Sequence, residues 1–337
     1  MLSAVLSAQD ISFDSVPFFK LPADMNFGEA AGVAVNSKGH VFVFSRGNST
    51  GPAYGATASQ LLEFGPDGRF LREIGKNLYA WSYAHAVKVD KDDNIWAIDK
   101  GSDMIVRFNP AGHVTMVFGR KKEASDEAAP WTRVTPPRPA VNGQFRQPTD
   151  VTWDAAGSIY ISDGYINSRI AKFDKNGDWL KQWGDRGKNP GEFNTPHSLA
   201  TDAKGKIYVA DRGNRRIQVF DGDGVYERET RIDVPVPPTM QPWMGNPLSP
   251  EQATAQSGAP WAICITPGPT QYLYSADGFP GRIYKLTLDG KVLGVMGRSG
   301  RQLKQFGWIH EMACPSENTI YAAEILNWRV QKLVLHP

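Results

Sequence analysis

Three histidines of this chain lie at matching positions of an internal repeat, and imidazole is the commonest protein ligand of transition metals. His85, His197 and His310 each lie 14 residues before the acidic residue that ends a short β-type run, namely Asp99, Asp211 and Glu324. Three imidazoles on one point leave coordination positions open, as in a catalytic zinc site rather than a closed structural one. The spacing therefore predicts a metal centre for zinc or another divalent transition metal, because imidazole also suits copper, iron and nickel.

These histidines belong to the second, fourth and sixth units of the repeat. The same count of 14 in the first, third and fifth units reaches Gly32, Thr149 and Ile263. The remaining histidines follow no register, and we interpret them as surface or turn residues: His40, His113 and His336. A single histidine at a strand start is usually a packing or capping residue, so the metal prediction depends on the register that the three share.

The elements that must position the histidines repeat six times along the chain. Each unit alternates short β-type runs with turn signals, as in SIYISDGYINSRIAKFDKNGDW. Four antiparallel strands per unit, repeated six times, predict an all-β, six-bladed β-propeller, with residues 1–337 as one domain. The sixth unit ends after its third strand, and we expect a strand near residues 15–22 to complete it and close the ring. The first strand of each blade then lines a central channel, and the histidines meet at one of its mouths.

Further residues with suitable chemistry are expected at the same mouth, because the second strand of each blade ends there. Tyr165 could act as a general base, since a phenol beside a metal has a lowered pKa. Arg46 and Arg212 could bind a carboxylate in bidentate fashion, and Arg46 would hold that of the substrate. A small-molecule or peptide substrate with a carboxylate would suit this set. Three aromatic residues flank the histidines and either shape the substrate pocket or simply pack: Trp81, Tyr83 and Trp308.

The polar residues that recur in most units are expected to be structural. An acidic residue after the second strand would bond loop amides, at Asp99, Asp163, Asp211 and Asp277. The arginines that begin the third strand belong to the same repeat, at Arg169, Arg216 and Arg282. Two insertions, residues 121–147 and 230–259, are expected to be long surface loops that could cover one face of the ring.

Composition excludes some classes of partner. Lys and Arg number 37 and Asp and Glu 35, so the formal charge of +2 indicates neither a nucleic-acid nor a membrane partner. We expect a monomer. Cys264 and Cys314 could pair but define no disulfide framework. The opening MLSAVLSAQD resembles the end of a signal peptide without its basic region, so residues 1–12 are either a signal remnant or a disordered start, and a secreted or periplasmic location is expected.

The motifs QPTDV, SDGYINSRI, PHSLA and ADRGNRRIQ, within residues 143–221, resemble the lyase domain of peptidylglycine α-amidating enzymes, among the NHL-repeat propellers. The resemblance implies a six-bladed propeller that cleaves peptidyl-α-hydroxyglycine into a peptide amide and glyoxylate. It implies zinc on the three register histidines, a catalytic role for Tyr165, and active-site roles for Arg46 and Arg212. It also implies a calcium ion in the channel, held by two backbone carbonyls and a carboxylate, at Val33, Val87 and Glu311.

The chain departs from that family at several positions. The family's disulfide is absent, because its cysteine positions hold Arg146 and Ile166. A family methionine near the substrate is Trp308 here, and the calcium-ligating aspartate is Glu311. Two other functions therefore stay open beside the lyase: a metal-dependent hydrolase or oxidase that uses the same three histidines, and a non-catalytic NHL-type binding propeller.

Overall fold

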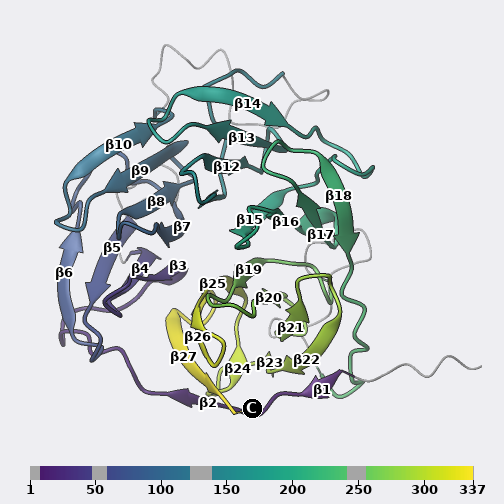
Figure 1. Ribbon diagram of the computed structural model, residues 1–337. Coiled ribbons are helices and arrows are strands. Elements are labelled where there is room, and N and C mark those ends of the chain that lie inside the picture. Colours follow the sequence, from purple (N-terminus) through teal and green to yellow (C-terminus); the bar gives the residue numbers. More distant parts are fainter. Residues whose placement is uncertain (1–7, 48–58, 122–138, 241–255, 337) are drawn as a thin grey trace, which may run out of the picture.

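Short strands joined by tight turns surround a central axis in the computed structural model, which describes residues 8–47, 59–121, 139–240 and 256–336 (Figure 1). The predicted six-bladed β-propeller is confirmed, with antiparallel four-stranded blades. The first three blades are β3 (Glu29–Val35), β4 (Val41–Arg46), β5 (Ser59–Phe64) and β6 (Phe70–Ile74); β7 (Ala84–Val89), β8 (Ile95–Asp99), β9 (Met104–Phe108) and β10 (Val114–Phe118); and β11 (Asp150–Trp153), β12 (Ile159–Asp163), β13 (Arg169–Phe173) and β14 (Trp179–Trp183).

The other three blades follow the same order from the axis outward. They are β15 (Pro196–Thr201), β16 (Ile207–Asp211), β17 (Arg216–Phe220) and β18 (Tyr226–Thr230); β19 (Ala262–Ile265), β20 (Tyr272–Ala276), β21 (Ile283–Thr287) and β22 (Val292–Met296); and β25 (Ile309–Ser316), β26 (Thr319–Glu324), β27 (Arg329–Leu335) and β2 (Phe13–Val16). Two short strands, β23 (Arg298–Ser299) and β24 (Gln305–Phe306), pair with each other. Within the described residues, no helix is long and apolar enough to cross a membrane.

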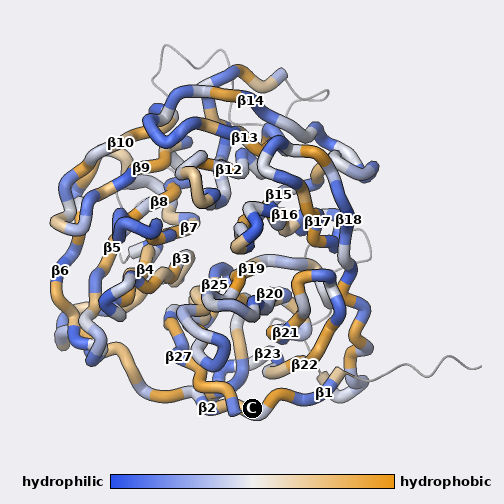
Figure 2. Tube along the Cα trace, viewed as in Figure 1, coloured by the Kyte–Doolittle hydropathy of each residue, from blue (hydrophilic) through white to orange (hydrophobic). Residues whose placement is uncertain are grey.

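The core lies between neighbouring blades. The second strand of a blade is packed on both faces, so a strand such as IWAID in β8 is buried throughout, whereas the outer strand β10 is largely exposed. Hydrophobic segments inside the blades alternate with hydrophilic turns around the whole ring (Figure 2). Between the first two blades, for example, Phe44, Trp81 and Phe108 pack their rings together, with centroids 4.8 and 5.9 Å apart.

An N-terminal strand closes the ring, as predicted, but it lies slightly earlier in the chain than expected and overlaps the expected range only at residues 15–16. Strand β2 (Phe13–Val16) pairs with β27, whereas the expected range was 15–22. The side chain of Phe13 is buried against Phe306, because the register of β2 turns it toward the hydrophobic core. Pro17 has no N–H to offer the ladder, which ends the strand there. Strand β1 (Gln9–Asp10) pairs with β22 of the fifth blade, so residues 9–10 of the expected signal remnant or disordered start are part of the sheet; residues 1–7 lie outside the described residues.

The recurring acids and arginines are structural, as predicted. Asp99 accepts hydrogen bonds from the amides of Ser82 and Tyr83, which lead into its own blade. Asp163, Asp211, Asp277 and Glu324 bind loop amides in the same way, at Arg146, Asn194, Gly258 and Gly307. Each of these residues therefore anchors the segment that connects its blade to the one before.

Arginines of the third strands hold the described parts of the two insertions. Arg169 donates to the carbonyls of Val141 and Gln144, and Arg282 to those of Val234 and Pro235. Residues 122–138 and 241–255 of the insertions lie outside the described residues, so their covering role stays a prediction.

Cys264 and Cys314 form a disulfide between β19 and β25, with their Cα atoms 6.0 Å apart. The bond links the fifth and sixth blades across a sequence separation of 50 residues.

Candidate metal centre at the channel mouth

The three register histidines meet on the axis at the mouth where the inner strands begin. The centroids of their rings are 4.6, 4.8 and 4.9 Å apart, and their candidate ligand atoms lie within 4.8 Å of one another. Each is the second residue of its inner strand, at a bulge in the pairing with the next strand. A β-bulge re-aims a side chain, and here it turns each imidazole toward the axis.

The alternate blades orient these imidazoles. The Nδ1 atoms of His85, His197 and His310 lie 2.7, 2.6 and 2.8 Å from the carbonyl oxygens of Thr149, Trp261 and Ala31, respectively. A carbonyl only accepts, so Nδ1 carries the hydrogen and Nε2 presents its lone pair toward the axis. Metal-ligating histidines usually have such an outer partner, which fixes the tautomer and the ring orientation.

In the odd blades, the count of 14 residues reaches the hydrogen-bond partner in one of three cases. It reaches Thr149, but in the first and fifth blades it reaches Gly32 and Ile263, whereas the partners are Ala31 and Trp261. In the first blade the bulge falls at Ala31, between the paired residues Ala30 and Gly32. In the fifth blade the partner precedes β19. A fixed count of residues along the sequence cannot anticipate these local shifts of one or two positions.

The electrostatics of the cluster suit a metal. Burial lowers the pKa of all three histidines well below the ordinary value, and neighbouring cations lower it further. The rings are therefore neutral at physiological pH, which is the form that ligates metals. The Nε2 atom of His197 is buried and has no hydrogen-bond partner, so its lone pair is available to bind a metal ion. These residues fit a zinc ion or another divalent transition metal.

Tyr165, in the loop after β12, lies beside this cluster. Its hydroxyl is 3.3 Å from Nε2 of His85, and its ring centroid is 6.0 Å from that of His197. Burial acts to raise the pKa of Tyr165, but the charges of Arg212, Lys100 and Arg46 outweigh it and bring the pKa below its ordinary value of 10.0.

The two predicted arginines differ in what they already bind. Arg46 donates to the carboxylate of Glu29 at 2.6 Å and to the carbonyl of Ala84 at 3.0 Å, and it stacks on Tyr83. Its charge is therefore partly balanced within the protein. Arg212 begins the 3₁₀ turn η2 (Arg212–Asn214) and is buried, and its Nε and Nη1 atoms have no hydrogen-bond partner.

Lys100 belongs to the site but was missed in the sequence. Its ammonium lies 4.1 Å from the ring centroid of Tyr165 and 4.9 Å from that of Tyr83. A signal existed, because Lys100 follows Asp99 just as Arg212 follows Asp211, and the same position is Gly or Ile in the other units. Trp261 was also missed: Arg212 stacks on its ring at 4.1 Å.

The three aromatic residues predicted for the pocket separate into two groups. Tyr83 and Trp308 are half-buried at the mouth, where Tyr83 lies under Arg46 and Trp308 packs on Trp261 at 5.1 Å. Trp81 is 1% exposed and belongs to the core between the first two blades. It is a packing residue rather than a pocket wall, because both neighbouring blades cover its ring.

The residues expected to hold calcium do not fit that ion. The Oε2 atom of Glu311 accepts hydrogen bonds from the amides of Val33 and Val87, at 3.1 and 3.0 Å. Its Oε1 atom lies 3.3 Å from the ammonium of Lys88. The carboxylate thus meets N–H groups and a built-in cation, where a calcium site requires oxygen ligands around the ion.

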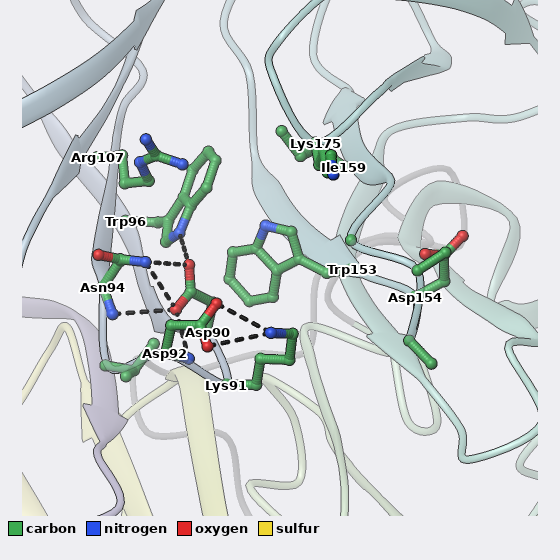
Figure 3. Close-up of a pocket in the computed structure, with 14 residues that line it drawn as sticks. Asp90, Lys91, Asp92, Asn94, Trp96, Arg107, Trp153, Asp154, Ile159 and Lys175 are labelled. Atoms are coloured by element: carbon green, nitrogen blue, oxygen red, sulfur yellow. Dashed lines mark hydrogen bonds and ion pairs between the residues drawn. The ribbon is translucent and has the colours of Figure 1, made fainter.

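A hollow lies at the end of the blades opposite the histidines, between the turns of the second and third blades (Figure 3). Its volume is about 380 Å³. The carboxylate of Asp90 accepts from Asn94 and from the indole of Trp96, and Lys91 pairs with Asp92 (Figure 3). Because these polar groups satisfy one another, the channel mouth is the stronger candidate site.

Comparisons with known proteins agree with this architecture. A family model described as a 6-bladed beta-propeller matches residues 144–245. Peptidylglycine alpha-amidating monooxygenase of Rattus norvegicus is 30% identical over 58% of this chain, and peptidyl-alpha-hydroxyglycine alpha-amidating lyase 1 of Drosophila melanogaster is 23% identical over 92%. NHL repeat-containing protein 3 of Mus musculus is 33% identical over 57% of the chain. The chain is a six-bladed β-propeller, similar in sequence to an NHL repeat-containing protein and to the amidating lyases.

The chain matches only part of each relative. The matched stretch is 21% of the length of the rat protein, 58% of the fruit-fly lyase and 51% of the mouse protein. Among solved structures, virginiamycin B lyase from Staphylococcus aureus has a TM-score of 0.58 at 14% identity, covering 97% of this chain and 100% of that one. At that identity the likeness supports the fold alone.

Proposed function

We propose that this propeller is a metal-dependent lyase that cleaves the C–N bond of an α-hydroxyglycine-type substrate to give an amide and glyoxylate. The observation that carries the proposal is a phenol of lowered pKa placed beside three neutral imidazoles whose Nε2 atoms converge. The sequence similarity to amidating lyases supports the same reaction class.

His85, His197 and His310 would hold the metal, which would supply Lewis-acid polarisation of the substrate hydroxyl oxygen. Tyr165 takes the hydroxyl proton as general base. The freed electron pair forms the new carbonyl bond, and the C–N bond breaks with its electrons going to the amide nitrogen. Tyr165 passes the proton to that nitrogen and returns to its phenolate form, so the products are a primary amide and glyoxylate. The cations around Tyr165 favour its phenolate form before each turnover.

Arg212 and Lys100 would hold the substrate carboxylate. Arg212 has two buried donor atoms without a partner, and Lys100 adds a second positive charge next to Tyr165. Hydrogen bonds to charged groups are worth about 1.5–3 kcal/mol. Arg46, which the sequence suggested for this role, is tied to Glu29 and instead contributes positive potential at the mouth.

The test offers a peptidyl-α-hydroxyglycine to the protein loaded with zinc and to the same protein after treatment with a transition-metal chelator. We expect glyoxylate and peptide amide in equal amounts from the loaded protein only. Metal content is measured on both samples by elemental analysis. Absence of glyoxylate from metal-loaded protein would contradict the proposed reaction, and a redox-active metal in the isolated protein would favour an oxidase instead.

We also propose that the protein functions in an oxidising compartment outside the cytoplasm. The Cys264–Cys314 bond supports this, because disulfides persist mainly in secreted and periplasmic proteins. Thiol titration of protein purified without reductant should find no reactive cysteine; two free thiols per chain would contradict it.

A further inference from the structure

A lysine side chain lies in the central channel, further along the inner strands than the histidines. Lys88, on β7, lies three residues after His85 and reaches between two carboxylates from other blades. Its Nζ atom is 3.4 Å from Oδ2 of Asp150 on β11 and 3.3 Å from Oε1 of Glu311 on β25. We call Lys88, Asp150 and Glu311 the lysine cluster. It joins three blades across the channel.

The two carboxylates bind further strands of the ring. Glu311 accepts from the amides of Val33 and Val87, in the first and second blades. Asp150 accepts from the hydroxyl of Ser198 and the amide of Leu199, at 2.9 and 2.8 Å, in the fourth blade. Inner strands of five blades therefore converge on two acidic side chains.

The approach of these strands is close enough to require glycine on the first one. A Cβ atom on Gly32 would lie 2.7 Å from Oε2 of Glu311 and 2.7 Å from the amide nitrogen of Val87. The cluster is packed as tightly as the backbone allows.

Two buried carboxylates need a cation beside them. Removing an ionised carboxylate from water costs several kcal/mol unless a countercharge compensates. Two buried carboxylates without a cation beside them would therefore strongly destabilise the fold. Burial raises the pKa of Asp150, while the charge of Lys88 opposes that shift. The carboxylates in turn outweigh burial and raise the pKa of Lys88, which keeps its ammonium charged.

We propose that Lys88 is a built-in substitute for a divalent cation, so that the channel of this propeller is held together without calcium. The side-chain ammonium lies 3.3 Å from Glu311, the carboxylate that the resemblance to amidating lyases implied as a calcium ligand, and it is covalently attached to one of the strands that it links. The cluster borders a hollow at the far end of the channel, lined by Lys88, Thr152 and Cys314 among others. An ion from solvent could therefore reach this position if the ammonium were absent.

The first arm of the test uses the wild-type protein, purified, treated with a calcium-selective chelator and then given 5 mM calcium chloride. We expect no bound calcium by elemental analysis and a melting temperature that moves by less than about 1 °C, since an ion without a site gives no linkage. One calcium per chain, or a melting temperature that rises with calcium, would overturn the proposal.

The second arm uses Lys88→Met, which keeps the length of the side chain and removes its charge. Without calcium, we expect the melting temperature to fall by at least about 5 °C, because breaking a buried pair leaves an uncompensated charge. Calcium at about 1 mM should restore most of the loss, with one ion bound per chain. The matched control is Lys91→Met, an exposed lysine on the adjacent turn, which should change neither property.

A Lys88→Met protein that is destabilised but indifferent to calcium would overturn the idea that Lys88 fills a cation site. If that variant folds in neither buffer, the wild-type arm decides, together with Lys88→Arg, which keeps the charge and should remain calcium-independent. The outcome does not depend on the proposed lyase activity, since both readouts are melting temperature and metal content.

Discussion

Two polar clusters lie on the same axis of this propeller, a few residues apart on the inner strands, and they differ in whether a cation of the chain lies among their buried acceptors. In the histidine cluster, the Nδ1 atoms are bound by backbone carbonyls, while the Nε2 atoms converge and that of His197 has no partner. In the lysine cluster, amides, a hydroxyl and an ammonium surround the carboxylates of Asp150 and Glu311. The Oε1 atom of Glu311 has no hydrogen bond, but the ammonium of Lys88 lies 3.3 Å from it. A buried polar cluster can bind a metal where no cation of the chain lies beside its lone pairs, and it acts as a structural link where one does.

The largest expected effect comes from removing one ligand of the histidine cluster. His197→Ala should lose the bound transition metal and reduce glyoxylate release below detection, because two imidazoles hold the ion weakly. Metal per chain and initial rate are the measurements. His113→Ala, at an exposed histidine outside the register, is the matched control and should keep both at the wild-type level. Full metal content in the His197→Ala protein would mean that the register does not define the metal site.

Removing the phenol tests whether the histidine cluster works with a base. Tyr165→Phe should lower kcat by about 10²- to 10⁴-fold while the metal stays bound. The wild-type rate should rise with pH until the phenol ionises, and the midpoint should fall below 10.0, since the cations lower the pKa of Tyr165. This basic rise should disappear in the Phe variant. A variant with the wild-type pH profile would assign the base elsewhere.

Two variants compare a cation proposed to bind the substrate carboxylate, Lys100, with one that the protein already pairs, Arg46. Lys100→Gln should raise KM for a carboxylate substrate by about 10-fold, which corresponds to the loss of about 1.4 kcal/mol. It should change little for the same substrate with its carboxylate blocked as an amide. Arg46→Gln should raise KM less, because Glu29 already binds that guanidinium. Equal effects of the two variants on the KM of both substrates would show that these cations provide only a general positive potential and that Lys100 does not bind the carboxylate.

The smallest expected effect on the metal centre comes from the disulfide, which lies near the lysine cluster. Replacing Cys264 and Cys314 together by serine should lower stability by about 2–4 kcal/mol, because the unfolded chain loses a cross-link. Metal content and kcat should stay at the wild-type values. Loss of metal in this variant would indicate that the two clusters are coupled through the fifth and sixth blades.

The histidine register could be found in the sequence because it rests on local features. Turn residues and period-2 apolar runs define each strand within a few residues, and the same unit recurs six times. Lys100 could have been found in the same way, by comparing the residue after each second strand. The bounds of the closing strand were misplaced because they depend on how Phe13 packs against Phe306, a residue distant in the sequence, which no local pattern records.

The sequence by itself determined the six-bladed architecture, the three histidines on alternate blades and the structural role of the repeated acids, since each follows from spacing within one unit. Only the tertiary structure decided that carbonyls of the odd blades orient the imidazoles, that Glu29 balances Arg46, and that Lys88 reaches Asp150 and Glu311. The pair Glu29–Arg46 lies across two strands of the first blade, and the other contacts join residues from different blades. Bulges shift their register by one or two positions, and a side chain such as Lys88 can span several ångströms, so the contacts depend on how the blades pack around the axis.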